Sequence, residues 1–192
     1  MPAITLHFDQ ETNQRLCNLY LKINQELGEE KGEHKKEEII ELDKIPHISL
    51  LRVQDTFTPH TIKLVKDGLQ KINDKKFQIE IHGVGVFKTG QDKYVLYFRP
   101  TYNTALQKIH QKIWNEFQDK VDLLEECYYS PNHYSLHITI HVKNMCKKSI
   151  LKVMDYLMEH NIHFPATVDT VAFVHIEKET EKSVVFVEQK LQ

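Results

Sequence analysis

Two short segments of this chain repeat one pattern, and this pattern restricts what the chain can fold into. A histidine followed two places later by a hydroxyl residue occurs at residues 46–50 (Pro-His-Ile-Ser-Leu) and at residues 136–140 (Leu-His-Ile-Thr-Ile). The alternation of polar and aliphatic residues is typical of a β-strand with one buried face, and we expect the second strand to span residues 134–141. Because successive side chains on a strand point to opposite faces, each segment offers one imidazole and one hydroxyl to a common surface.

Two imidazoles on one surface suit the cleavage of a phosphodiester near neutral pH. A neutral histidine removes a proton from the attacking oxygen, and a protonated one gives a proton to the leaving oxygen. Histidine serves both tasks because its unperturbed pKa is about 6.5. We therefore predict His47 and His137 as general base and general acid, in either order. Ser49 and Thr139 would donate hydrogen bonds to the non-bridging phosphate oxygens, and the scheme needs no metal.

The paired motifs, 90 positions apart in a chain of 192 residues, resemble the two-histidine (2H) phosphoesterase superfamily. This superfamily includes the 2′-5′ RNA ligase-like proteins, cyclic nucleotide phosphodiesterases and RNA 3′-end trimming exonucleases. Residues 83–87 (Gly-Val-Gly-Val-Phe), followed by a turn and an apolar strand, also resemble the superfamily's layout between its motifs. Ser49 departs from the more usual threonine, which keeps the hydroxyl donor and loses only a methyl group.

The resemblance implies a metal-independent phosphodiesterase without a cofactor. Its substrate would be an RNA or nucleotide phosphodiester: a 2′-5′ linkage, a 2′,3′-cyclic phosphate or an RNA 3′ end. The alternative is a catalytically silent nucleotide- or RNA-binding module with the same groove. Ligase activity is disfavoured because the chain shows no nucleotidyl-transfer lysine motif and no phosphate-cradling glycine loop.

Composition limits the partners and the compartment. With 25 basic and 27 acidic residues the net charge is −2, so no global attraction to nucleic acid or anionic membranes is expected, and any RNA contact must be local. Three scattered cysteines indicate reduced thiols. The first residues lack the basic and apolar pattern of a signal peptide, and no apolar run approaches membrane-spanning length, so we expect neither feature. We expect a cytoplasmic or nuclear monomer without a membrane partner, folded as a single domain over residues 1–192 with two intimately packed lobes.

The hydrophobic periodicity predicts four helices and a set of strands around the two motifs. Spacings of three and four residues predict helices at 10–27, 58–72, 101–117 and 145–160, the first two capped by Asp9 and Thr58. Further strands are predicted at 4–8, 77–81, 83–87, 94–99, 166–176 and 183–189. The charged residues 29–38 predict a solvated loop or helix end.

The second half of this order repeats the organisation of the first half. The duplication predicts an α+β fold, which the resemblance identifies as bilobal and 2H phosphoesterase-like. Two antiparallel sheets would be related by a pseudo-two-fold axis around a central groove, with helices on the outside. Both motif strands would line the groove, which is the natural place for a ligand.

Three further residues are candidates for substrate binding, each with a structural alternative. The ring of Tyr134 would stack on a nucleobase or cover an edge of the core. His141 is expected at the edge of the groove. Arg52 would clamp a phosphate or be an ordinary surface arginine.

A metal site is the other interpretation of the second motif. His133, His137 and His141 fall on one face of a strand, but residues four apart on a strand stand roughly 13 Å from each other. That spacing is too wide for two ligands of one ion. We therefore expect no metal.

Overall fold

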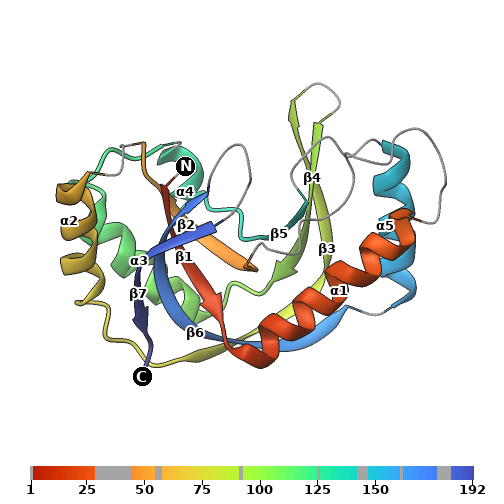
Figure 1. Cartoon of the computed structure of the whole chain (residues 1–192), viewed down its shortest axis with the longest axis horizontal. Coiled ribbons are helices and arrows are strands. Elements are labelled where there is room, and N and C mark those ends of the chain that lie inside the picture. Colours follow the sequence, from red (N-terminus) through yellow and green to blue (C-terminus); the bar gives the residue numbers. More distant parts are fainter. Residues whose placement is uncertain are drawn as a thin grey trace.

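Helices and strands alternate along the chain, and the motif strands sit in the middle of one sheet. The computed structural model describes residues 2–28, 45–54, 58–90, 93–124, 126–141, 147–160, 162–176 and 183–192 (Figure 1). The elements in this part of the chain are β1 (Pro2–Phe8), α1 (Gln10–Gly28), β2 (His47–Arg52), α2 (Pro59–Leu69), β3 (Phe77–Gly90), β4 (Lys93–Pro100), α3 (Thr104–Phe117), α4 (Glu126–Tyr129), β5 (Ile138–His141), α5 (Lys147–Glu159), β6 (His163–Ile176) and β7 (Ser183–Lys190).

All pairings are antiparallel, and they follow the order β1-β2-β5-β4-β3-β6-β7. Strand β6 also pairs with β1. Because Val168 pairs with Phe8 of β1 and with Phe77 of β3, these two strands lie on opposite edges of β6. The ladder thus returns to its first strand, and the two motif strands are joined where β2 pairs with β5.

The duplicated α+β architecture with outer helices is confirmed. Each half runs from a motif strand through a helix to two more strands: β2-α2-β3-β4 and β5-α5-β6-β7. Helices α2 and α3 pack together at one end of the sheet, and α1 and α5 pack together at the other (Figure 1). The two predicted sheets are joined into one by the β2–β5 and β6 pairings.

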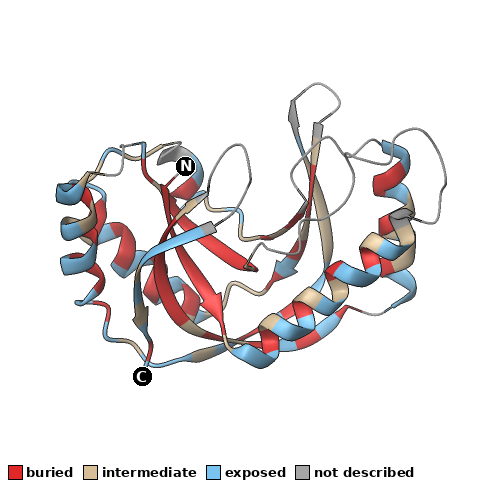
Figure 2. Ribbon diagram, viewed as in Figure 1, coloured by how far each residue is buried: buried red, intermediate tan, exposed pale blue. Residues whose placement is uncertain are grey.

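The faces of the sheet differ in character, as β1 illustrates. Ile4, Leu6 and Phe8 point into the main apolar core with the buried side chains of the helices, whereas Thr5 and His7 point to the other face. Figure 2 shows the buried residues concentrated on the strands and on one side of each long helix. A period of two along the strand produces this division.

Side-chain hydrogen bonds to the first turn determine where the helices begin. Asp9 Oδ1 accepts a hydrogen bond from the Thr12 N–H at 2.9 Å, and Thr58 Oγ1 accepts one from the Thr61 N–H at 3.1 Å, so both predicted caps are confirmed. The third helix begins at Thr104 instead of residue 101, because Asn103 is its cap. Each cap satisfies a backbone N–H that the helix itself cannot.

Other predicted boundaries also differ from the structure. Residues 77–81 and 83–87 belong to one strand, β3, because Gly83 (φ 77°) absorbs a register shift that would otherwise end the ladder. The second motif strand is shorter than 134–141: β5 begins at Ile138, and His137 immediately precedes it. The connection before it contains the short helix α4. The charged segment 29–38 lies outside the described residues.

No helix in the described ranges is both long enough and apolar enough to cross a membrane.

Candidate active site

The register between β2 and β5 brings the two motifs together. The central isoleucines of the motifs, Ile48 and Ile138, are paired. Counting outward from this antiparallel pair places His47 opposite Thr139 and Ser49 opposite His137. These four side chains share the face of the sheet that the isoleucines do not use. We call it the motif face.

On such a ladder, directly opposite side chains have Cβ atoms about 5 Å apart, and diagonal ones are about 7–8 Å apart. His47 and His137 are the diagonal pair, and so are Ser49 and Thr139. Two imidazoles at this spacing can stand on either side of one phosphate group while the hydroxyls lie at the other two corners.

Both histidines are held in the same orientation by the backbone. His47 Nδ1 donates to the Ile45 carbonyl at 2.8 Å, and His137 Nδ1 donates to the Ser135 carbonyl at 2.7 Å. A carbonyl oxygen only accepts, so the Nδ1 of each ring carries the proton. In the neutral form Nε2 therefore holds the lone pair, and Nε2 is the atom that gains or loses a proton on both rings.

The surroundings of His137 favour its neutral form. Burial lowers the pKa of His137 from its usual value near 6.5, and the positive charge of Arg52 lowers it further, while the hydrogen bond to the Ser135 carbonyl acts in the opposite direction. Desolvation disfavours the charged imidazolium. A neutral His137 with a lone pair on Nε2 has the properties of a general base.

Arg52 reaches the motif face because of a bulge. The β1–β2 register shifts by one residue between Ser49 and Leu51, after which Arg52 pairs with Ala3. Leu51 is buried in the core. Strict alternation from Ser49 would put Arg52 on the core face, but the extra residue returns it to the face of Ser49. Its guanidinium carbon lies 5.7 Å from the centre of the Tyr129 ring.

Tyr134 links the second motif to the first. Its hydroxyl donates to the Ser49 carbonyl, and burial raises its pKa well above the usual value. The ring packs against His110, with centroids 4.6 Å apart, and also against Tyr102 and Tyr129. Of the two roles considered from the sequence, this packing supports the structural one.

His141 is the last residue of β5, and its backbone pairs with Leu96. Its side chain lies outside the part of the chain that the structure describes. His133, by contrast, sits in the turn before β5, where its Nδ1 is 3.1 Å from Ser130 Oγ. Within the described ranges, no three His, Cys, Asp or Glu side chains gather in a way that could hold a metal ion.

Sequence reasoning missed an aromatic wall beside His137. The rings of Phe87 and Tyr97 lie 5.3 and 5.9 Å from the His137 ring, and 5.2 Å from each other. Gly85 faces Tyr97, and a Cβ at this position would overlap the Tyr97 ring. The glycine therefore makes room for the ring to lie across β3. Alternation along residues 94–99 signals that Tyr97 and Arg99 share a face, but it does not indicate which neighbour they meet.

A third histidine on the motif face was also missed. His7 pairs with His47 across β1 and β2, and their ring centres are 6.3 Å apart. Alternation in residues 3–8 puts Thr5 and His7 on one face. However, their place beside the motif follows only from the pairing of β1 with β2.

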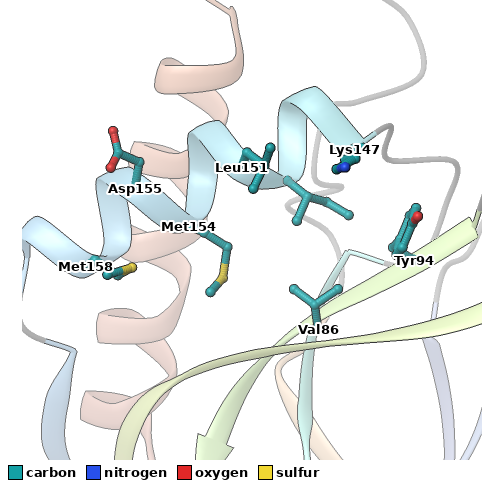
Figure 3. Close-up of a pocket in the computed structure, with 8 residues that line it drawn as sticks. Val86, Tyr94, Lys147, Leu151, Met154, Asp155 and Met158 are labelled. Atoms are coloured by element: carbon teal, nitrogen blue, oxygen red, sulfur yellow. The ribbon is translucent and has the colours of Figure 1, made fainter.

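A hollow of about 440 Å³ lies elsewhere, between α5 and the β3–β4 hairpin (Figure 3). Its lining includes Val86, Tyr94, Leu151, Met154 and Met158. Val86 is next to Phe87 in β3 and points to the opposite face. The hollow is thus on the helix side of the sheet, away from the motif face.

Comparison with known proteins agrees with this fold. Three solved structures cover the whole of this chain: TT0787 of Thermus thermophilus (TM-score 0.63, 13% identity, 98% of that chain covered), E. coli LigT complexed with 3′-AMP (0.63, 8%, 98%) and E. coli LigT complexed with ATP (0.59, 8%, 96%). At these identities the likeness concerns the fold alone. A search of curated proteins finds no match.

A family model supplies the assignment that the distant structures cannot. The 2′-5′ RNA ligase superfamily matches residues 22–180, which include both motifs and most of the chain. The resemblance to 2H phosphoesterases inferred from the motifs is confirmed, and this chain belongs to the 2′-5′ RNA ligase superfamily.

Proposed function

We propose that this protein is a metal-independent phosphodiesterase that acts on an RNA or nucleotide phosphodiester at the motif face. The observation that carries the proposal is the β2–β5 register, which sets His47 and His137 diagonally across a rectangle completed by Ser49 and Thr139. Membership in the superfamily and a fold shared with nucleotide-bound LigT structures support a nucleotide as the substrate.

In the proposed reaction the two rings take opposite roles: His137, whose surroundings favour the neutral form, is the base, and His47 is the acid. Neutral His137 takes the proton of the attacking water or ribose hydroxyl through Nε2 as the new O–P bond forms. Protonated His47 gives its Nε2 proton to the oxygen of the leaving group as the old P–O bond breaks. Each cycle thus takes one proton at His137 and supplies one at His47, and exchange with solvent restores the starting forms.

The remaining residues hold the phosphate and the nucleobase of the substrate. Hydroxyl donors at Ser49 and Thr139 stabilise charge on the non-bridging oxygens, and Arg52 adds a positive charge on the same face. The rings of Phe87 and Tyr97 offer flat surfaces beside His137 on which a nucleobase stacks. Tyr134 acts indirectly, by holding the Ser49 backbone. His141, at the end of β5, stays a candidate contact for the substrate.

The test is turnover of a substrate panel in the presence of EDTA. A 2′,3′-cyclic nucleotide, a 2′-5′-linked dinucleotide, a 3′-5′-linked dinucleotide and a short RNA with a free 3′ end cover the candidate linkages. We expect EDTA to leave the rate unchanged, and His47→Ala or His137→Ala to lower kcat by about 10²–10⁴-fold. His60→Ala is the matched control, because His60 is exposed on α2, away from the sheet.

Two results would contradict the proposal. One is turnover that survives both motif substitutions in proteins with the circular dichroism spectrum of the wild type. The other is tight nucleotide binding without any product at stoichiometric enzyme, which would indicate the silent binding module instead.

A further inference from the structure

The third histidine on the motif face has a defined environment. His7 lies directly across from His47, on the neighbouring strand, and both residues are 8% exposed. His7 therefore reaches the surface to the same extent as the histidine to which we assign proton transfer. Nothing in the proposed reaction uses it.

The hydrogen bonds of Thr5 favour a proton on Nε2 of His7. Thr5 Oγ1 donates to the Ala172 carbonyl at 3.4 Å, and it also lies 2.9 Å from His7 Nε2. The hydroxyl has one proton, and a carbonyl can only accept. His7 Nε2–H is then the donor to Thr5, which leaves the lone pair on Nδ1. Among the residues that the structure describes, Nδ1 of His7 has no hydrogen-bond partner.

The charge state of His7 is also set by its surroundings. Burial lowers the pKa of His7 to about 4; Lys190 on β7 lowers it as well, and Asp169 on β6 raises it. The facing side chain on β2 is His47. At neutral pH the ring is uncharged, and Nδ1 is a hydrogen-bond acceptor.

Apart from Nε2 of neutral His137, which the proposed reaction uses as the base, the groups around this phosphate site are donors: the hydroxyls of Ser49 and Thr139 and the protonated imidazole of His47. Nδ1 of His7 is a second acceptor. A phosphodiester has no donor of its own, so an acceptor there must face another group of the substrate. His7 is one strand away from His47, a spacing of about 5 Å. At this distance from the phosphorus, the donors that a nucleotide offers are the hydroxyls of the adjoining ribose, since the base amino groups lie farther away.

We propose that Nδ1 of His7 accepts a hydrogen bond from the ribose hydroxyl next to the bound phosphate, and that His7 thereby selects ribonucleotides over deoxyribonucleotides. The inference rests on the proposed function only in requiring that a nucleotide phosphate binds on the motif face. It does not require turnover.

Calorimetric titration measures the ribose preference separately from turnover. The probes are adenosine 3′-monophosphate, its 2′-deoxy analogue and inorganic phosphate. The variants are His7→Gln, whose amide mimics the Nε2 end of the ring, and His7→Asn, whose amide lies where Nδ1 was. We expect the wild type and His7→Asn to bind the ribonucleotide about three- to ten-fold more tightly than the deoxy analogue. His7→Gln should bind both equally, with phosphate affinity changed less than two-fold. His60→Gln is the control.

A lone pair on Nδ1 can be detected directly by NMR in the wild-type protein. The ¹⁵N chemical shifts of His7 in the wild type at pH 7 should show an unprotonated Nδ1 and a protonated Nε2. The inference is overturned by a protonated Nδ1, by a wild type that does not discriminate between the nucleotides, or by a His7→Gln variant that loses phosphate affinity while keeping its ribose preference. If no substrate is cleaved but the ribose preference depends on His7, the proposed function fails and this inference stands.

Discussion

The two motif histidines share an orientation, but the functions that we propose for them depend on the charges around them. In both rings the backbone holds Nδ1–H, so that Nε2 is the titrating atom. For His137 the neutral form is favoured by burial and by Arg52. A single substitution that changes this field should therefore change the pH dependence of catalysis without touching the ring itself.

Arg52→Gln removes a positive charge that acts on His137. The imidazolium is then less disfavoured, so the pKa of His137 should rise. If His137 is the base, it becomes protonated at a higher pH, and the ascending limb of the kcat–pH profile should move to higher pH. The limb and the ¹H titration of the His137 ring should shift together. Arg15→Gln, which removes a guanidinium 4.0 Å above the Phe164 ring, should leave both unchanged.

His7 should make the protein sensitive to acid. The pKa of His7 is about 4 in the folded protein, against about 6.5 in an unfolded chain. Between these values only the unfolded chain takes up the proton, so the free energy of unfolding falls as the pH drops from 6.5 towards 4. Protonation of His7 in the unfolded chain lowers the free energy of unfolding by about 3 kcal/mol over this pH range. Chemical denaturation of wild type and His7→Gln at pH 7 and pH 4 measures it.

In the His7→Gln variant this loss should be absent, so its stability relative to the wild type should rise by about the same 3 kcal/mol from pH 7 to pH 4. Equal acid sensitivity of the two proteins would mean that His7 is protonated in the folded state at pH values where we expect it to be neutral.

At the scale of elements, the β3–β4 hairpin depends on a glycine to hold the aromatic wall. Gly85→Ala would push the Tyr97 ring from its place, because the new Cβ would overlap it. Overpacking of this kind costs about 1–3 kcal/mol of stability. It should also weaken nucleotide binding, because Tyr97 flanks His137.

A matched control exists at α2, where Gly68→Ala would bring a Cβ to 2.5 Å from the Phe117 ring. Both variants should lower Tm, but only Gly85→Ala should raise the Kd for adenosine 3′-monophosphate. Equal affinities of the two variants for adenosine 3′-monophosphate would show that the aromatic wall is not part of the binding site.

Local rules account for much of the fold and fail at identifiable places. Caps such as Asp9 and the face of each motif histidine depend only on near neighbours, so the sequence predicts them. A strict alternation of faces does not predict the bulge that turns Arg52 towards the motif face. Similarly, His7 becomes part of the site only through the pairing of β1 with β2. Pairings between distant strands are set by packing of the whole core, which periodicity does not contain.

At the scale of the whole molecule, the proposed site lies on the seam where β2 pairs with β5. Each motif strand belongs to a different half, and β2 and β5 meet through a short ladder centred on Ile48 and Ile138. The geometry of the four motif side chains therefore depends on contacts that keep this ladder in register. Tyr134 is such a contact, since it precedes the second motif and bonds the backbone of the first.

Tyr134→Phe deletes only the hydroxyl that bonds the segment before β5 to the Ser49 backbone of β2. The Ser49 carbonyl loses a buried partner, which should cost about 1–2 kcal/mol of stability. Because the ring is retained among Tyr102, His110 and Tyr129, the aromatic cluster should stay packed. The loosened seam should lower kcat more than it raises KM, since chemistry needs both histidines aligned while binding needs only one half at a time.

The control for this substitution is Tyr102→Phe, which removes a hydroxyl bonded to His110 in the same cluster but leaves the Tyr134–Ser49 hydrogen bond in place. Unfolding measurements on both variants report the stability cost, and steady-state kinetics separate kcat from KM. A kcat that falls equally in the two variants would show that the cluster as a whole, and not the link across the seam, aligns the motifs. A fall confined to Tyr134→Phe would show that one hydroxyl couples the two halves into a single site.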